Sequence, residues 1–233
     1  MRDEFMLNIF EKYVPGTDYL DVGPLFGTVN ETLSVASRYS PRSLSAADID
    51  PLDADSWEAL RSHLASKNVE GVKEFSVSID DPTIVEKTGA FDFVYSAGIL
   101  YHVPSPVYTL QQYRKLTRKY FLLGSMVVPE EIENDQGRLD FSGGKLVFIP
   151  AIGEAERRVM AAHYDQYDMK IHHINATDSW PWRHNGEPSY GPWWWLYSPS
   201  TCKRMIETAG FKVISEESTW GGRHHYFFCE KID

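Results

Sequence analysis

Apolar runs of strand length alternate with segments of helical periodicity over the first 128 residues, and this alternation constrains the fold more than any other feature. The predicted strands span residues 19–22, 43–50, 74–80, 91–98 and 119–128. The predicted helices span residues 5–13, 30–39, 55–66 and 106–117. A chain that alternates in this way buries a parallel sheet between two layers of helices. The sequence therefore predicts an α/β fold with a doubly wound sheet.

The end of the chain predicts a strand that runs against the others. A helix begins at Ser198 and ends at Gly210, and strands are predicted at 211–217 and 224–231. Because few residues separate these two strands, they should pair antiparallel.

The alternation lapses between residues 129 and 192, where one helix is predicted at 153–163. We interpret this stretch as an insert in a single domain of residues 1–233, whose core comprises 1–128 and 193–233. The insert is expected to cap the carboxyl edge of the sheet, where open α/β sheets bind their ligands.

A glycine-rich loop follows the first predicted strand, in the sequence YLDVGPLFGT. It contains Asp21, Gly23 and Gly27, but Leu25 stands where a dinucleotide loop of the form G-x-G-x-x-G needs bare backbone. We therefore expect Leu25 to oppose a pyrophosphate and hence NAD, although an NAD-dependent oxidoreductase stays the second enzyme hypothesis. A cofactor without phosphates is less demanding.

Carboxylates follow the next two predicted strands. Asp48 and Asp50 end the second strand, and Asp80 and Asp81 end the third, on the same edge of the sheet. A carboxylate at the first of these places can accept hydrogen bonds from both ribose hydroxyls. Several carboxylates around one crevice suit a ligand with positive charge.

Four segments in this order, YLDVGPLFG, AADIDP, IDD and FDFVYSAGILYHVPSP, resemble the signature segments of class I S-adenosylmethionine-dependent methyltransferases. The resemblance covers roughly residues 15–128 and 193–231 and implies a Rossmann-like sheet with S-adenosylmethionine as cofactor. It implies Asp21, Gly23 and Gly27 at the methionine end, Asp48 on the ribose and Asp80 near the adenine amino group. Ser96, Ala97 and Gly98 would form the floor beneath the sulfonium. Ile49 and Asp81, beside these acids, complete the predicted cofactor site.

The substrate side is predicted from polar and aromatic residues. His102 directly follows the predicted floor and is either a general base or a structural histidine that fixes the turn before Pro104. The family often inserts a substrate-binding cap where this chain has residues 129–192, so His163 and Arg183 are candidates to hold a substrate. Trp194, in the run WWW, is a third candidate.

A metal site is not predicted. His172 and His173 are adjacent, and neighbouring residues of a strand point to opposite faces, so they do not readily share an ion.

Charge and composition favour a small-molecule substrate. The net charge is −10 and the pI about 5.3, which opposes binding to a phosphate backbone. We therefore expect methyl transfer to an oxygen, nitrogen or carbon atom of a small molecule, such as a sugar or a natural-product intermediate. Two alternatives stay open: a transfer-RNA wobble-uridine methyltransferase, which the WWWLYSPSTCKRMIETAGF segment resembles, and a non-catalytic partner subunit that binds S-adenosylmethionine.

The N-terminal sequence MRDEFMLNIFEKY carries charges between its apolar residues, unlike a signal peptide, and we expect a cytoplasmic protein without membrane contact. Cys202 and Cys229 match no zinc or redox spacing and are expected to be reduced core thiols. The sequence does not indicate an oligomeric state.

Overall fold

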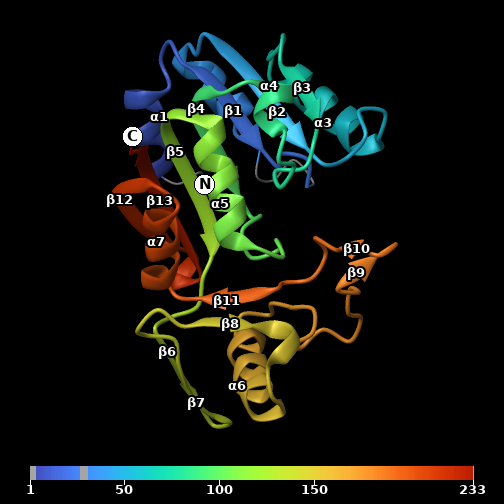
Figure 1. Cartoon of the computed structure of the whole chain (residues 1–233), viewed down its shortest axis with the longest axis vertical. Helices are drawn as coiled ribbons and strands as arrows, with labels where there is room; N and C mark the ends of the chain where they lie inside the picture. Colours follow the sequence, from blue (N-terminus) through green and yellow to red (C-terminus); the bar gives the residue numbers. More distant parts are fainter. Residues whose placement is uncertain (1–3, 27–30, 233) are drawn as a thin grey trace.

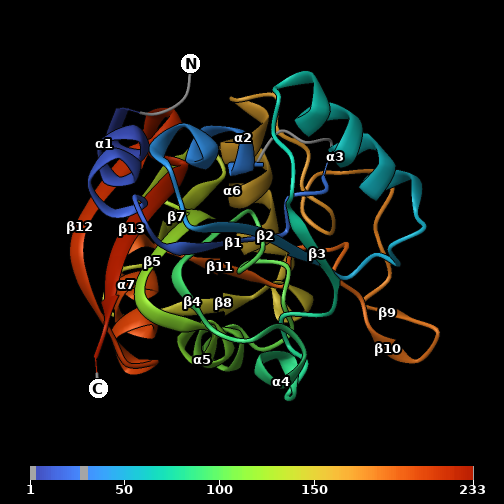
Figure 2. The same ribbon diagram turned by 90° about the horizontal axis from the view of Figure 1, so that it is seen from above.

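Seven strands form one twisted sheet in the order β12-β13-β5-β4-β1-β2-β3 in the computed structural model, which describes residues 4–26 and 31–232 (Figures 1 and 2). The strands are β1 Asp18–Val22, β2 Ser43–Asp48, β3 Lys73–Ser76, β4 Phe91–Ala97, β5 Thr117–Met126, β12 Phe211–Thr219 and β13 His224–Lys231. The first five pair in parallel, whereas β13 is antiparallel to both β5 and β12. The predicted α/β sheet with a reversed final strand is confirmed.

Helices cover both faces of the sheet (Figure 2). One face packs against α1 Glu4–Tyr13, α2 Leu33–Ala36 with the 3-10 turn η1 Ser37–Tyr39, and α3 Asp55–Ser66. The other packs against α4 Ile84–Thr88, α5 Pro106–Leu116 and α7 Pro199–Thr208. Strand β4 contributes to both layers, because Phe93 and Tyr95 face one hydrophobic cluster and Val94 faces the other. Burial on both faces explains why its sequence, FDFVYSA, has apolar residues at successive positions instead of alternating with polar ones.

Three local features differ from the prediction. Strand β3 ends at Ser76, four residues earlier than expected, so Asp80 and Asp81 lie in the turn that leads into α4. Helix α4 has only five residues and was not predicted, because so short a segment shows no helical period. The helix predicted at 30–39 is α2 plus η1, beginning at Leu33.

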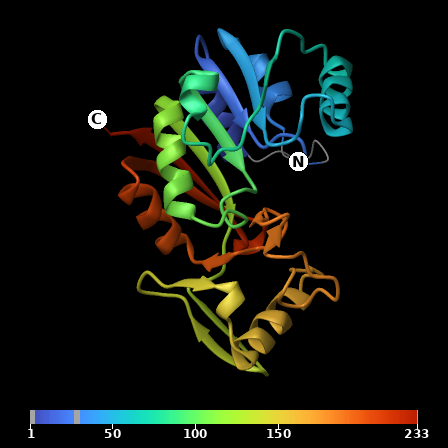
Figure 3. The same cartoon turned by 45° about the vertical axis from the view of Figure 1, so that its right-hand side comes forward.

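The stretch between β5 and α7 forms a smaller lobe below the carboxyl ends of the parallel strands (Figures 1 and 3). Its elements are β6 Glu131–Asn134, β7 Gly137–Asp140, β8 Leu146–Phe148, η2 Ile149–Ala151, α6 Glu154–Asp165, β9 Arg183–His184, β10 Glu187–Pro188 and β11 Trp195–Tyr197. The lobe packs on a hydrophobic cluster of its own, to which α6 contributes Val159, Met160 and Tyr164. Strand β11, which leads back to the core, pairs antiparallel with β8 of the lobe.

Candidate functional site

The turn after β1 requires glycine at its first position. Gly23 has a φ of +83°, and a Cβ atom added there would lie 2.4 Å from Cδ1 of Ile99, the residue that follows the predicted floor. Its N–H donates to the carbonyl of Ala47 on β2, at 2.9 Å. The turn is therefore held tightly between the carboxyl ends of three neighbouring strands, and a side chain would displace Ile99.

Leu25 does not stand over this loop. Its side chain is only 6% exposed and belongs to the hydrophobic cluster that also contains Leu33 and Trp57, on the face covered by α2 and α3. The expectation that Leu25 obstructs a pyrophosphate was therefore wrong, because the leucine is turned into the core. The next residue, Phe26, is 84% exposed. Gly27 lies outside the described residues.

Asp21 is buried beside the loop, at 1% exposure. Its Oδ2 accepts hydrogen bonds from the backbone N–H of Thr32 at 2.7 Å and from the Thr32 hydroxyl at 2.8 Å. Burial raises the pKa of Asp21 to about 7; the charges of Glu31 and Asp48 add to this shift, and the two hydrogen bonds from Thr32 oppose it. This carboxyl is poised to ionise when a cation comes near.

Asp48 ends β2 on the opposite side of the loop. Its Oδ1 accepts from the N–H of Ile49 at 2.7 Å, and its Oδ2 lies 3.4 Å from the N–H of Leu25. Burial raises the pKa of Asp48. Ile49 itself is half exposed. Asp21 and Asp48 thus lie on neighbouring strands beside the glycine turn, and the cofactor crevice expected there stays a prediction.

Asp80 and Asp81 have different surroundings although they are adjacent. Asp80 accepts from the hydroxyl of Thr109 on α5 at 2.5 Å and from the hydroxyl of Tyr190 in the lobe at 3.0 Å. The carboxylate of Asp81 bonds to Lys87 and to the backbone and hydroxyl of Thr83, and the Lys87 hydrogen bond lowers its pKa to about 2. Asp81 is therefore engaged with the start of α4, and Asp80 is the better cofactor candidate.

The predicted floor lies at the end of β4. The Ser96 side chain is buried, and its hydroxyl bonds to the Tyr113 hydroxyl at 2.7 Å and to the carbonyl of Val22 at 3.2 Å. Ala97 is buried, and Gly98 has a φ of +79° and donates its N–H to Gly124 on β5. At the predicted floor, Ala97 and Gly98 therefore contribute only backbone and a methyl group. The side chain of Ser96 points into the core instead.

His102 has a fixed tautomer. Its Nδ1 lies 3.0 Å from the carbonyl oxygen of Pro192, which can only accept a hydrogen bond, so Nδ1 carries the proton. Burial lowers the pKa of His102 to about 4, which keeps the ring neutral at pH 7. Nε2 therefore has a lone pair and can accept a proton.

Residues 189–195 form a strap between the lobe and the core. The strap bonds to Asp80 through Tyr190 and to His102 through Pro192, and the N–H of Trp194 donates to the carbonyl of Tyr101 at 2.8 Å. Sequence patterns did not identify Tyr190, because its place opposite Asp80 depends on how the lobe folds back. The only signal was its position near the tryptophan run, from which Gly191 and Pro192 separate it.

The tryptophan of the WWW run whose ring lies near His102 is Trp193. Its centroid lies 4.3 Å from that of Tyr101 and 6.1 Å from that of His102. The ring of Trp194 packs instead against Trp182 and Phe148 inside the lobe. We therefore replace Trp194 by Trp193 as the candidate substrate contact; neighbouring residues of an extended segment point in opposite directions.

The other two lobe candidates lie apart. His163 is on α6, where its buried Nε2 has no hydrogen-bond partner and burial lowers its pKa. Arg183 is exposed on the β9–β10 hairpin and donates to the carbonyl of Gly186 in the same hairpin, at 2.8 Å. Figures 1 and 2 place this hairpin away from α6, so the structure does not bring Arg183 together with His163.

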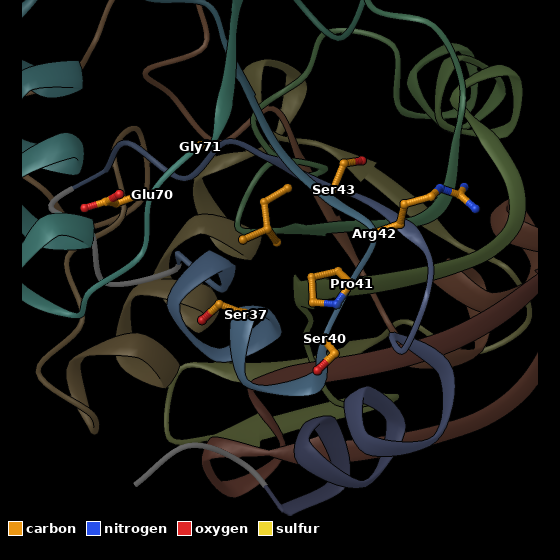
Figure 4. Close-up of a pocket in the computed structure, with 8 residues that line it drawn as sticks. Ser37, Ser40, Pro41, Arg42, Ser43, Glu70 and Gly71 are labelled. Atoms are coloured by element: carbon orange, nitrogen blue, oxygen red, sulfur yellow. The ribbon is translucent and has the colours of Figure 1, made fainter.

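A surface hollow of about 250 Å³ lies at the opposite edge of the sheet (Figure 4). It is lined by η1, by the start of β2 and by Gly71. A second hollow, of about 320 Å³, adjoins it at Ser43 and Leu44. Both lie at the amino end of β2, whereas Asp48 and Gly23 lie at the carboxyl edge, so neither hollow belongs to the predicted site.

Neither a metal-binding cluster nor a membrane-spanning helix occurs in residues 4–26 and 31–232. This part of the chain holds no group of three or more His, Cys, Asp or Glu side chains placed to share a metal ion. None of its helices is long and apolar enough to cross a membrane.

No protein-family model and no curated protein matches the sequence. Solved structures do match. An O-methyltransferase family protein from Burkholderia thailandensis is 14% identical with a TM-score of 0.60, over 99% of this chain and 56% of that one. The 1,6-didemethyltoxoflavin N1-methyltransferase of the same organism, with its substrate and S-adenosylhomocysteine bound, is 11% identical with a TM-score of 0.55, over 99% and 80%. A possible exported protein from Bordetella parapertussis is 10% identical with a TM-score of 0.58, over 98% and 66%.

The chain thus spans only about half to two thirds of the length of two of these proteins. Identities this low show the fold, and the chain has the Rossmann-like fold of S-adenosylmethionine-dependent methyltransferases. The resemblance predicted from four sequence segments is confirmed at the level of the fold.

Proposed function

We propose that this chain is an S-adenosylmethionine-dependent methyltransferase that acts on an oxygen or nitrogen atom of a small molecule, with carbon as a further acceptor. The observation that carries the proposal is the glycine turn at Gly23 with the carboxylates Asp21 and Asp48 on either side, at the carboxyl edge of a sheet with the methyltransferase fold. The net charge of −10 supports a small molecule over a nucleic acid. A cytoplasmic location stays a prediction.

The residues at this edge fit the cofactor. Gly23 lets Ile99 pack directly against the backbone of the turn, and Asp21 would lie at the methionine end. Asp48, with Ile49 beside it, would hold the ribose, Asp80 the adenine amino group, and Ala97 with Gly98 the underside. When bound, S-adenosylmethionine supplies an electrophilic methyl group on a sulfonium, whose positive charge suits a crevice lined by carboxylates.

His102 is the proposed general base. Its Nε2 would accept the proton that an acceptor hydroxyl or amine loses, since Nδ1 already carries the proton that it donates to the carbonyl of Pro192. The same bond also ties the strap to the core, so His102 has a structural role beside the catalytic one.

Calorimetric titration with S-adenosylhomocysteine and with NAD tests the cofactor. We expect S-adenosylhomocysteine to bind and NAD not to, because the chain ends in the antiparallel strand β13, which opposes an NAD-dependent oxidoreductase. Asp48→Ala should weaken binding by about 1.5–3 kcal/mol, because charge-assisted hydrogen bonds are lost. Asp53→Ala, at an exposed position on the same loop, is the matched control and should bind like the unmodified chain. Equal affinity of the two variants would show that Asp48 does not hold the ribose.

Transfer of a labelled methyl group to a panel of small-molecule acceptors tests the activity. A methylated product would support the proposed methyltransferase activity. If S-adenosylhomocysteine binds but no acceptor is methylated, the non-catalytic partner subunit becomes the better explanation.

A further inference from the structure

An aromatic cluster lies where α6 of the lobe meets the turn after β4. The ring of Trp193 is its centre, with centroid distances of 4.3 Å to Tyr101, 6.0 Å to Tyr164 and 6.1 Å to His102. His163, beside Tyr164 on α6, has its ring 5.2 Å from that of Tyr164. The cluster joins the proposed base His102 to the lobe.

Two polar atoms of this cluster are buried without a hydrogen-bond partner, the hydroxyl of Tyr164 and Nε2 of His163. Tyr164 is 1% exposed, so its hydroxyl has lost water as well as any protein partner. Leaving such a group unsatisfied costs about 1–3 kcal/mol, and a folded chain seldom retains one without a reason. A ligand that hydrogen-bonds to both atoms would remove this cost.

The charges around the cluster favour an uncharged ligand. Burial lowers the pKa of both His102 and His163, so both rings are neutral at pH 7. The nearest arginine to His163, Arg223, stacks on the ring of Tyr167 at 3.9 Å and donates to the carbonyl of Trp220. Neither histidine offers a cation to a phosphate or a carboxylate.

We propose that Tyr101, His163, Tyr164 and Trp193 bind the methyl acceptor, and that the acceptor is a neutral, hydroxylated aromatic compound. Trp193 and Tyr101 pack against its ring, as aromatic side chains do with planar ligands. The Tyr164 hydroxyl and Nε2 of His163 bond to its polar substituents, and His102 Nε2 faces the hydroxyl to be methylated. This proposal rests on the methyltransferase function proposed above and narrows its substrate class.

The first test compares two buried tyrosines. Tyr164→Phe removes a hydroxyl without a partner, so the melting temperature should rise by about 2–4 °C. Tyr197 is equally buried, but its hydroxyl bonds to Ser125 at 2.8 Å, so Tyr197→Phe should lower the melting temperature. A fall for Tyr164→Phe as large as for Tyr197→Phe would mean that the hydroxyl is satisfied within the protein and would overturn the proposal.

The second test measures binding by calorimetry with S-adenosylhomocysteine present. Catechol and 8-hydroxyquinoline should bind, and methyl glucoside and uridine 5′-monophosphate should not. Tyr164→Phe should weaken catechol binding about tenfold, as expected for one lost hydrogen bond, whereas Tyr197→Phe should not change it. Three outcomes would each refute the aromatic acceptor. The sugar or the nucleotide binds instead, neither aromatic probe binds, or catechol binds to Tyr164→Phe with unchanged affinity.

Titration of every variant with S-adenosylhomocysteine alone separates this inference from the proposed function. If the unmodified chain does not bind it, the methyltransferase proposal fails. If it binds with unchanged affinity in all variants while the aromatic probes do not bind, only the acceptor class is wrong.

Discussion

Replacing Asp21 by asparagine removes the most strongly buried charge of the candidate site. Asparagine has the same shape, and its side-chain oxygen can still accept the two hydrogen bonds from Thr32. It cannot ionise, however. The substitution therefore isolates the effect of the charge from the effect of packing.

The expected magnitude follows from the pKa. Burial raises the pKa of Asp21 from an ordinary value of 3.8 to about 7 in the folded chain. Between about pH 4 and pH 7 the carboxyl of Asp21 keeps its proton in the folded chain and has lost it in the unfolded chain. The raised pKa therefore contributes its full stabilisation below about pH 4, and this contribution is lost as the pH rises to 7. The whole shift corresponds to about 4 kcal/mol, at about 1.4 kcal/mol for each pH unit. Between pH 5 and pH 8 the free energy of unfolding of the unmodified chain should fall by about 3 kcal/mol relative to that of Asp21→Asn.

Urea denaturation at several pH values between 5 and 8 measures this difference, and thermal unfolding should show it as roughly 6–12 °C. Asp18→Asn is the control. A hydrogen bond from Arg42 holds the pKa of Asp18 well below its usual range, so Asp18 stays ionised over this interval in both states. The difference in unfolding free energy between Asp18→Asn and the unmodified chain should therefore not vary with pH. A difference for Asp21→Asn that is equally constant would refute the assignment of a buried, protonated carboxyl.

Three further variants test the loop, the strap and the base. Gly23→Ala should destabilise the fold and reduce S-adenosylhomocysteine affinity, because the new methyl group meets Ile99; a normal titration and melting curve would contradict this. Tyr190→Phe removes the hydrogen bond to Asp80 and should weaken S-adenosylhomocysteine binding several-fold by calorimetry, without unfolding the chain. His102→Asn can keep the hydrogen bond to Pro192 but has no base. It should therefore lower turnover about 10²–10⁴-fold at an unchanged melting temperature. Normal turnover would mean that His102 has a structural role only.

The core of the fold could be predicted because its signals are local. Strand β4 is buried along its whole length, and its apolar residues occupy successive positions on both faces. The last two strands are joined by so few residues that only an antiparallel hairpin is possible. The helix α6 was predicted from its periodicity within a residue or two. The strands of the lobe were not predicted. Strand β8 has three residues and depends on β11, about fifty positions away, for its pairing.

The site was predictable only where backbone geometry fixes it. Gly23 and Asp48 follow from the ends of strands, which sequence patterns locate. Leu25 shows the limit, because a residue at a glycine position can turn its side chain into the core, and no local pattern reveals the direction. The same applies to Trp193 and Trp194, whose rings separate only when the strap is held against Tyr101.

The strap, residues 189–195, connects the proposed cofactor site with the proposed base. One short segment bonds to Asp80, at the proposed adenine end, and to His102, the proposed base, although Asp80 lies in the connection after β3 and His102 in the connection after β4. Trp195 adds a third tie, from its indole N–H to the carbonyl of Val103. Tyr190 and Pro192 are separated only by Gly191, so a displacement of the strap would disturb both contacts. Cofactor affinity and the orientation of the base would therefore be coupled in this chain.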